Sequence, residues 1–116
     1  MAELSRLMDL RGAVAAWEFT PVGEIISYKG DLSEESLRPI SKLCAANALM
    51  GESEVEGFAR VAGSKWEPFH GFAMSAGDYS LCVIGHLAVY VETAKADFNE
   101  IYKVLADEAH VLLKAA

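Results

Sequence analysis

The sequence predicts an α/β (α+β) fold, a three-layer α/β/α sandwich in which a five-stranded antiparallel sheet lies between helices. Five short apolar runs predict the strands, and strands that follow each other with no helix between them are joined by connections too short for parallel crossovers. The runs 79–84 and 87–91 are apolar at nearly every position, so helices must cover both faces of the sheet. The element order α-β-β-α-β-β-β-α is expected to form one domain over residues 1–116.

The N-terminal part predicts a short helix followed by a hairpin. Apolar residues recur at helical spacing within 2–11, and the aromatic, apolar run 13–20 is typical of a strand. Pro21-Val22-Gly23 has the residues of a tight turn, and 24–29 then predicts the second strand. The short connection makes this pair antiparallel.

A long helix follows the hairpin. Ser33 can cap its N-terminus, but Pro39 lies beyond the first turn, so we expect a kink there or a start nearer Ser36. The apolar residues that follow keep a helical period, and a glycine, Gly51 or Gly57, is expected to end the helix.

Three more strands and a helix complete the chain. Residues 66–75 contain Pro68, which suits an edge strand, whereas 79–84 and 87–91 form a hairpin of central strands. A helix opens at Asp97 with residues resembling a capping box. Its expected apolar stripe consists of Phe98, Ile101, Tyr102, Leu105, Ala109 and Leu112.

The composition limits the classes of function. The 17 acidic residues exceed the 10 basic ones and give a net charge of −7, which disfavours nucleic acids and anionic membranes as partners. No apolar run approaches the ~20 residues of a membrane-spanning helix. The N-terminus lacks the long apolar region of a signal peptide, so we expect a cytoplasmic protein with no membrane insertion.

The sequence contains no recognisable catalytic, metal or cofactor motif. Neither the spacings of zinc sites nor the glycine-rich motifs that bind phosphates and dinucleotides are present. Cys44 and Cys82 lie in apolar surroundings and are expected to be free core thiols. His70, His86 and His110 are far apart in the sequence and show no ligand spacing. We therefore expect no catalytic residue, no metal and no cofactor.

Several segments resemble the roadblock (dynein light chain) superfamily, which includes gliding-motility proteins that regulate small Ras-like GTPases. They are the opening helix through Gly12-Ala13-Val14, the hairpin AVAAWEFTPVGEIISYKG, the long apolar helix, and the run from Gly77 to Thr93. Val22-Gly23 stands where the family typically has Asp-Gly. The segments GDLSEE and KLCAANALMG look like an uncharacterised prokaryotic subgroup of this roadblock/profilin-like fold.

The resemblance implies a homodimer that pairs through the long helix and the third strand. The aromatic residues of a poor, proline-containing strand also favour an interface, because an exposed apolar edge is otherwise an aggregation hazard. Asn47 lies on the apolar side of the long helix, where it either faces solvent or bonds its symmetry mate. The candidate interface residues are Leu43, Asn47, Met50, Trp66, Phe69 and Phe72.

Two functions remain open from the sequence. The first is a non-enzymatic homodimeric scaffold or regulatory module that binds a protein, with a small Ras-like GTPase as the partner class that the resemblance implies. The second is a sensor module for a small ligand, which needs an apolar pocket with a few polar groups. Tyr28, Tyr79, Tyr90 and Met74 are candidates to line such a pocket.

Overall fold

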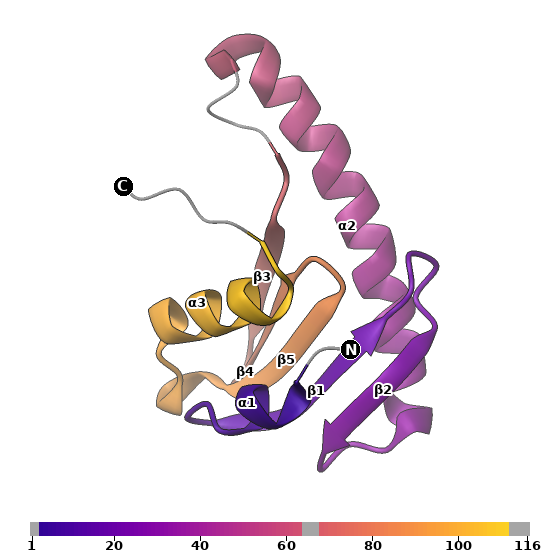
Figure 1. Cartoon of the computed structure of the whole chain (residues 1–116), viewed down its shortest axis with the longest axis vertical. Coiled ribbons are helices and arrows are strands. Elements are labelled where there is room, and N and C mark those ends of the chain that lie inside the picture. The colour runs from indigo at the N-terminus through magenta and orange to yellow at the C-terminus, as the bar shows by residue number, and fades with distance from the viewer. Residues whose placement is uncertain (1–2, 64–67, 112–116) are drawn as a thin grey trace.

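The computed structural model describes residues 3–63 and 68–111, and it shows the predicted order of helices and strands. Figure 1 shows the arrangement. The elements are α1 (Leu4–Met8), β1 (Ala13–Phe19), β2 (Ile25–Gly30), α2 (Glu34–Ala62), β3 (Gly71–Ala76), β4 (Tyr79–Ile84), β5 (Leu87–Glu92), the 3₁₀ turn η2 (Thr93–Lys95) and α3 (Phe98–Glu108).

The five strands form one antiparallel sheet in the order β2-β1-β5-β4-β3. This order confirms the predicted fold class. The first hairpin and the β3-β4-β5 meander meet where β1 pairs with β5, so the two chain halves are joined in the middle of the sheet. β2 and β3 are the edge strands. β3 is therefore at an edge, as its neighbouring proline indicated.

Helices cover the two faces of the sheet (Figure 1). α2 packs on one face, where Trp17, Phe19 and Leu37 are fully buried. α1 and α3 cover the other face, with Leu7 and Ile101 against the central strands. Because side chains alternate along a strand, each central strand contributes to both cores. The three-layer sandwich is thus the arrangement that its apolar strands require.

The N-terminus of α2 lies before the expected start nearer Ser36. The Ser33 side chain accepts a hydrogen bond from the Ser36 amide, and the helix begins at Glu34. Pro39 lies inside the helix on its exposed side. Proline removes one helical hydrogen bond, and at an exposed position water can solvate the carbonyl that is left.

The C-terminus of α2 lies beyond both predicted ends. The helix continues past Gly51 and Gly57 to Ala62. Neither glycine has a positive φ angle, and a glycine within a helix costs only about 1 kcal/mol relative to alanine. Figure 1 shows the C-terminal half of α2 rising beyond β1 and β2.

The third strand and the last helix are shorter than expected. β3 starts at Gly71, and Pro68, Phe69 and His70 precede it without strand structure. Gly71 allows a close approach, because a Cβ there would overlap the Val83 carbonyl of β4. Trp66 lies outside the described residues.

The last helix keeps only part of its predicted stripe in the core. Ile101 and Leu105 are buried, whereas Phe98 and Tyr102 are 41% and 44% exposed. Leu112 lies outside the described residues. Asp97 caps the helix as predicted, since its carboxylate accepts a hydrogen bond from the Glu100 amide. Within the described residues, no helix has both the length and the apolar character needed to cross a membrane.

Candidate interaction surface

The edge strand β3 is the least covered part of the sheet. Four of its six residues are exposed, including Met74, and none of its residues is buried. Its only neighbour in the sheet is β4, so its outer edge is unpaired within the described residues. An edge strand presents unpaired backbone groups that another strand can join.

The long helix α2 carries apolar side chains that its own sheet does not bury. The buried residues of α2 all lie in its N-terminal half and are Leu37, Ser41 and Cys44. A second face, here called the α2 stripe, consists of Leu43, Asn47, Met50, Glu54 and Val61. Residues three, four and seven positions apart share one side of a helix. Leu43, Met50 and Val61 are 64%, 61% and 89% exposed.

A hollow of about 450 Å³, here called the α2/β3 groove, lies between α2 and the strands β3, β4 and β5. Leu43 and Asn47 belong to both the groove and the α2 stripe. Tyr79 and Tyr90 stack at its floor, with ring centroids 5.0 Å apart and an interplanar angle of 11°. The lining residues are Ile40, Leu43, Cys44, Asn47, Met74, Ala76, Tyr79, Ser80, Leu81 and Tyr90.

Three of the four residues proposed to line a ligand pocket meet in this groove. They are Tyr79, Tyr90 and Met74, which come from three different strands. Tyr28 lies on β2, at the opposite edge of the sheet, and does not line it.

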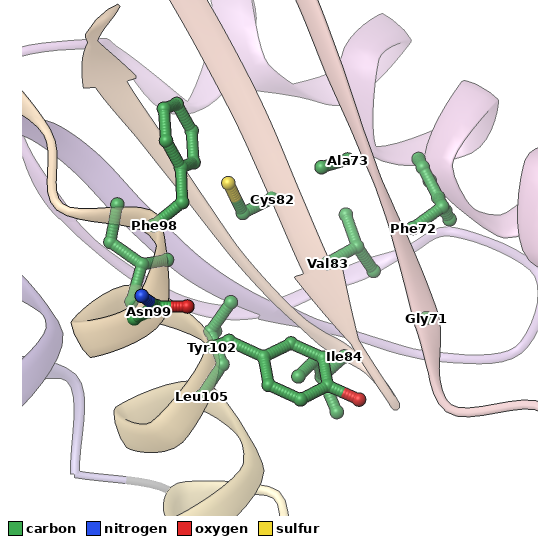
Figure 2. A pocket seen from close by; sticks show the side chains of 11 residues that line it. Gly71, Phe72, Ala73, Cys82, Val83, Ile84, Phe98, Asn99, Tyr102 and Leu105 are labelled. Carbon is green, nitrogen blue, oxygen red and sulfur yellow. The ribbon is translucent and has the colours of Figure 1, made fainter.

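A second hollow of about 300 Å³ lies on the other face of β3, against α3 (Figure 2). Phe98 and Tyr102 of α3 form one wall, and Ala73 and Cys82 of the sheet contribute to the floor. This hollow explains the exposure of Phe98 and Tyr102, because α3 covers the central strands but not β3. Sequence reasoning missed this second hollow, because it joins β3, β4 and α3, and α3 is far from β3 in the chain.

The six candidate interface residues have different surroundings. Leu43, Asn47 and Met50 lie together on the α2 stripe, where Asn47 is partly buried. Phe69 lies against α2, because a Cβ at Gly51 would overlap its ring. Phe72 packs partly into the core beneath α2. Trp66 lies outside the described residues. The structure thus brings the helical candidates together and gives the two phenylalanines contacts within the chain.

The cysteines have the environment of core residues. Burial raises the pKa of the Cys44 thiol to about 11 and also raises the pKa of Cys82. A nucleophilic cysteine needs the opposite shift, because the thiolate is the reactive form. The Cys44 environment therefore gives no support to nucleophilic catalysis.

Two histidines that are distant in the sequence line one shallow hollow of about 290 Å³. His86 and His110 lie there beside Glu18 and Glu108. Glu108 is already engaged, since it accepts hydrogen bonds from the Glu3 amide and the Arg6 guanidinium. Across residues 3–63 and 68–111, no three His, Cys, Asp or Glu side chains are placed to hold a metal ion. The absence of bound metal stays a prediction that elemental analysis of the purified protein can test.

Comparisons with known proteins give a family and a fold. The family model described as "Uncharacterized conserved protein (DUF2173)" matches residues 3–107. No curated protein matches the sequence.

Three solved structures are similar to this one. A roadblock/LC7 domain from Streptomyces avermitilis has a TM-score of 0.73 and 15% identity, over 91% of this chain and 87% of that chain. MglB in a tetrameric arrangement has a TM-score of 0.68 and 18% identity, over 93% and 83%. The gliding protein MglB from Thermus thermophilus has a TM-score of 0.66 and 18% identity, over 93% and 84%. The roadblock-like fold implied by the sequence resemblance is confirmed.

Proposed function

The chain belongs to the family described as Uncharacterized conserved protein (DUF2173), and we propose that it acts as a non-catalytic homodimeric regulatory or scaffold module. The observation that carries the proposal is the continuity of its uncovered surface. The unpaired edge of β3, the α2/β3 groove and the α2 stripe adjoin one another, because Leu43 and Asn47 belong to both groove and stripe. One partner surface can therefore cover all three.

A second copy is the occupant that we propose for this surface. A two-fold dimer is the commonest way to bury one patch against itself. β3 of a second copy would pair with the free edge of β3, and the two α2 stripes would pack together. Large exposed apolar patches on a folded chain mark interaction sites. The roadblock-like fold supports this choice, because the resemblance implies pairing through the same two elements.

The partner of the dimer is proposed to be another protein, and a small Ras-like GTPase is the class to test first. The similarity of this fold to that of the gliding protein MglB supports testing a small Ras-like GTPase first. The net charge of −7 supports a protein partner over nucleic acid. We propose that the protein acts in the cytoplasm, and this proposal rests on the sequence alone.

Light scattering of the full chain tests the homodimer. We expect a dimer at micromolar concentrations and a shift towards monomer for Met50→Asp, because the change puts a charge into an apolar interface. Leu49→Asp is the matched control, since Leu49 is 68% exposed but lies on another side of α2. A wild-type monomer at up to about a tenth of a millimolar would rule out the homodimer as a working state.

A small-ligand sensor is the second candidate. The α2/β3 groove supports it, because stacked Tyr79 and Tyr90 with Asn47 form an apolar hollow that contains a polar amide. A panel of small metabolites in a thermal-shift assay tests this function. Saturable stabilisation that Tyr90→Ala removes would favour the sensor, and no stabilisation by any compound would favour the scaffold.

A further inference from the structure

Glu18 is a carboxylate that the described residues leave without a counter-charge. It lies on β1, and side-chain alternation places it on the same face of the sheet as Ala16, the face that α1 and α3 cover. Its Oε1 atom is buried, and no donor among the described residues bonds to it. Arg6 reaches this end of α3, but its guanidinium contacts Asp107 and Glu108. Because an unpaired charge is costly to bury, a cation beside Glu18 would be stabilising.

Two histidines line the same hollow of about 290 Å³ as this carboxylate. His86 belongs to the turn between β4 and β5, and its ring centroid lies 5.6 Å from that of Phe19. His110 directly follows the C-cap of α3. The turn lies against the end of α3, since a Cβ at Gly85 would be 3.4 Å from the Ala109 Cβ. The fold thus gathers a carboxylate and two imidazoles around one hollow from three elements.

The acceptors of this hollow match the donors of an ammonium group. A carboxylate accepts hydrogen bonds, a neutral imidazole has one acceptor nitrogen, and an ammonium group on a single carbon has three donors. The partial negative charge at the C-terminus of α3 also favours a cation. Leu87 and Ala109 add apolar surface to the lining, against which methylene groups can pack. We propose that the hollow binds a primary alkylammonium group, held by Glu18, His86 and His110.

A metal ion fits the same hollow less well. Nitrogen and oxygen ligands must lie about 2 Å from a zinc ion, and no three such side chains within 3–63 and 68–111 are placed to do so. Hydrogen bonds to an ammonium nitrogen span about 2.7–3.2 Å, so their acceptors can lie further apart. The ammonium group can belong to a free amine or to a lysine side chain of a protein. The net charge of −7 attracts either source.

An NMR titration of the full chain with butylammonium chloride at pH 7.5 tests the site. We expect saturable shifts of the amide signals of Gly85, Leu87 and His110, with a dissociation constant of about 1–10 mM. Sodium chloride at the same ionic strength and the uncharged analogue butanol are the controls, and neither should reproduce these shifts. Absence of saturable shifts with butylammonium up to about 0.1 M would overturn the proposal.

A matched pair of variants separates the site from the overall negative charge. Glu18→Gln is expected to weaken butylammonium binding about tenfold or more, because it removes a charged acceptor of the same shape. Glu35→Gln removes the same charge from an exposed position on α2 and should leave the dissociation constant unchanged. Glu18→Gln also removes an unpaired charge, so thermal unfolding should show a fold at least as stable as the wild type. Equal binding by the two variants would overturn the proposal.

His110→Gly tests the imidazole without straining the backbone. Glycine accepts the φ of 58° at this position, so the variant should keep the fold while it weakens butylammonium binding about threefold or more. Zn²⁺ binding that depends on Glu18, His86 and His110, with no binding of butylammonium, would overturn the proposal in favour of a metal site.

A capped Gly-Lys-Gly peptide, compared with its norleucine counterpart, distinguishes the two sources of the ammonium group. Binding of the lysine peptide at least as tight as that of butylammonium would support a lysine side chain of a protein as the ligand. Binding of butylammonium alone would support a free amine. The hollow lies on the face of the sheet opposite α2, so its failure to bind amines would leave the proposed homodimer intact. A monomeric wild type would in turn leave this site intact.

Discussion

His110 adopts a backbone conformation that usually belongs to glycine. It follows the last turn of α3 with φ of 58°. The Val111 amide donates to the Ala106 carbonyl at 2.8 Å, and the His110 amide donates to the Asp107 carbonyl at 3.2 Å. These are the two hydrogen bonds of a Schellman motif, which most often has glycine at the position of His110.

Replacing His110 by glycine should therefore stabilise the fold. We expect His110→Gly to raise the free energy of unfolding by about 1 kcal/mol, because a left-handed conformation strains residues that carry a Cβ. Urea denaturation followed by circular dichroism measures the change. His110→Ala keeps the strain and is expected to give no gain. A loss of stability for His110→Gly would show that the imidazole makes a contact that outweighs the strain.

The Cys44 thiol should be slow to react in the folded chain. Its ordinary pKa of 9.0 rises to about 11 on burial, so its thiolate fraction at pH 8 falls about a hundredfold. Labelling with a small thiol reagent, followed by peptide mass spectrometry, measures the rate in the native and urea-unfolded chain. The folded chain binds the Cys44 thiol proton more tightly than the unfolded chain does. The free energy of unfolding that this proton contributes is therefore present below pH 9 and is lost as the pH rises from 9 towards 11. Equal labelling rates in both states would contradict the buried position of Cys44.

At the scale of the element, α3 divides into a core side and an open side. Leu105 is 1% exposed and lies in the core, whereas Tyr102, one turn earlier, borders the hollow against β3. Leu105→Ala should lower the free energy of unfolding by about 2–5 kcal/mol, because it leaves a cavity beneath the helix. Tyr102→Ala should cost much less, and denaturant titration compares the two. A cost below about 1 kcal/mol for Leu105→Ala would contradict the central role of α3 in the core that it forms with α1 and the sheet.

Element boundaries were predictable where local chemistry sets them. β4 runs from Tyr79 to Ile84, as predicted, because turn residues flank a continuous apolar run. The end of α2 was not predictable, since a helix passes through Gly51 and Gly57 when the penalty is small. The start of β3 depends on pairing with β4, and pairing is not local. The sequence therefore predicts the elements better than their ends.

At the scale of the molecule, the exposed apolar face of α2 was predictable only in part. Leu43, Asn47 and Met50 were candidate interface residues, and Leu43 and Met50 are exposed on one side of the helix. Gly57 was interpreted as a possible end of the helix, whereas α2 continues past it to Ala62. Three of the four candidate pocket residues do meet in the α2/β3 groove, whereas the hollow between β3 and α3 needed the tertiary structure. The pairing of the surface with a second copy stays a prediction.

A chain that folds as a dimer should gain thermal stability with concentration. Dimerisation stabilises the folded state by mass action, so a hundredfold rise in concentration adds about 2.7 kcal/mol per dimer. We expect the wild-type Tm to rise by several degrees between micromolar and tenth-millimolar protein. Met50→Asp should have a Tm that does not depend on concentration, while Leu49→Asp should behave like the wild type. Differential scanning calorimetry measures all three chains. A concentration-independent Tm for the wild type, together with a monomeric mass in solution, would mean that the α2 stripe serves a different partner.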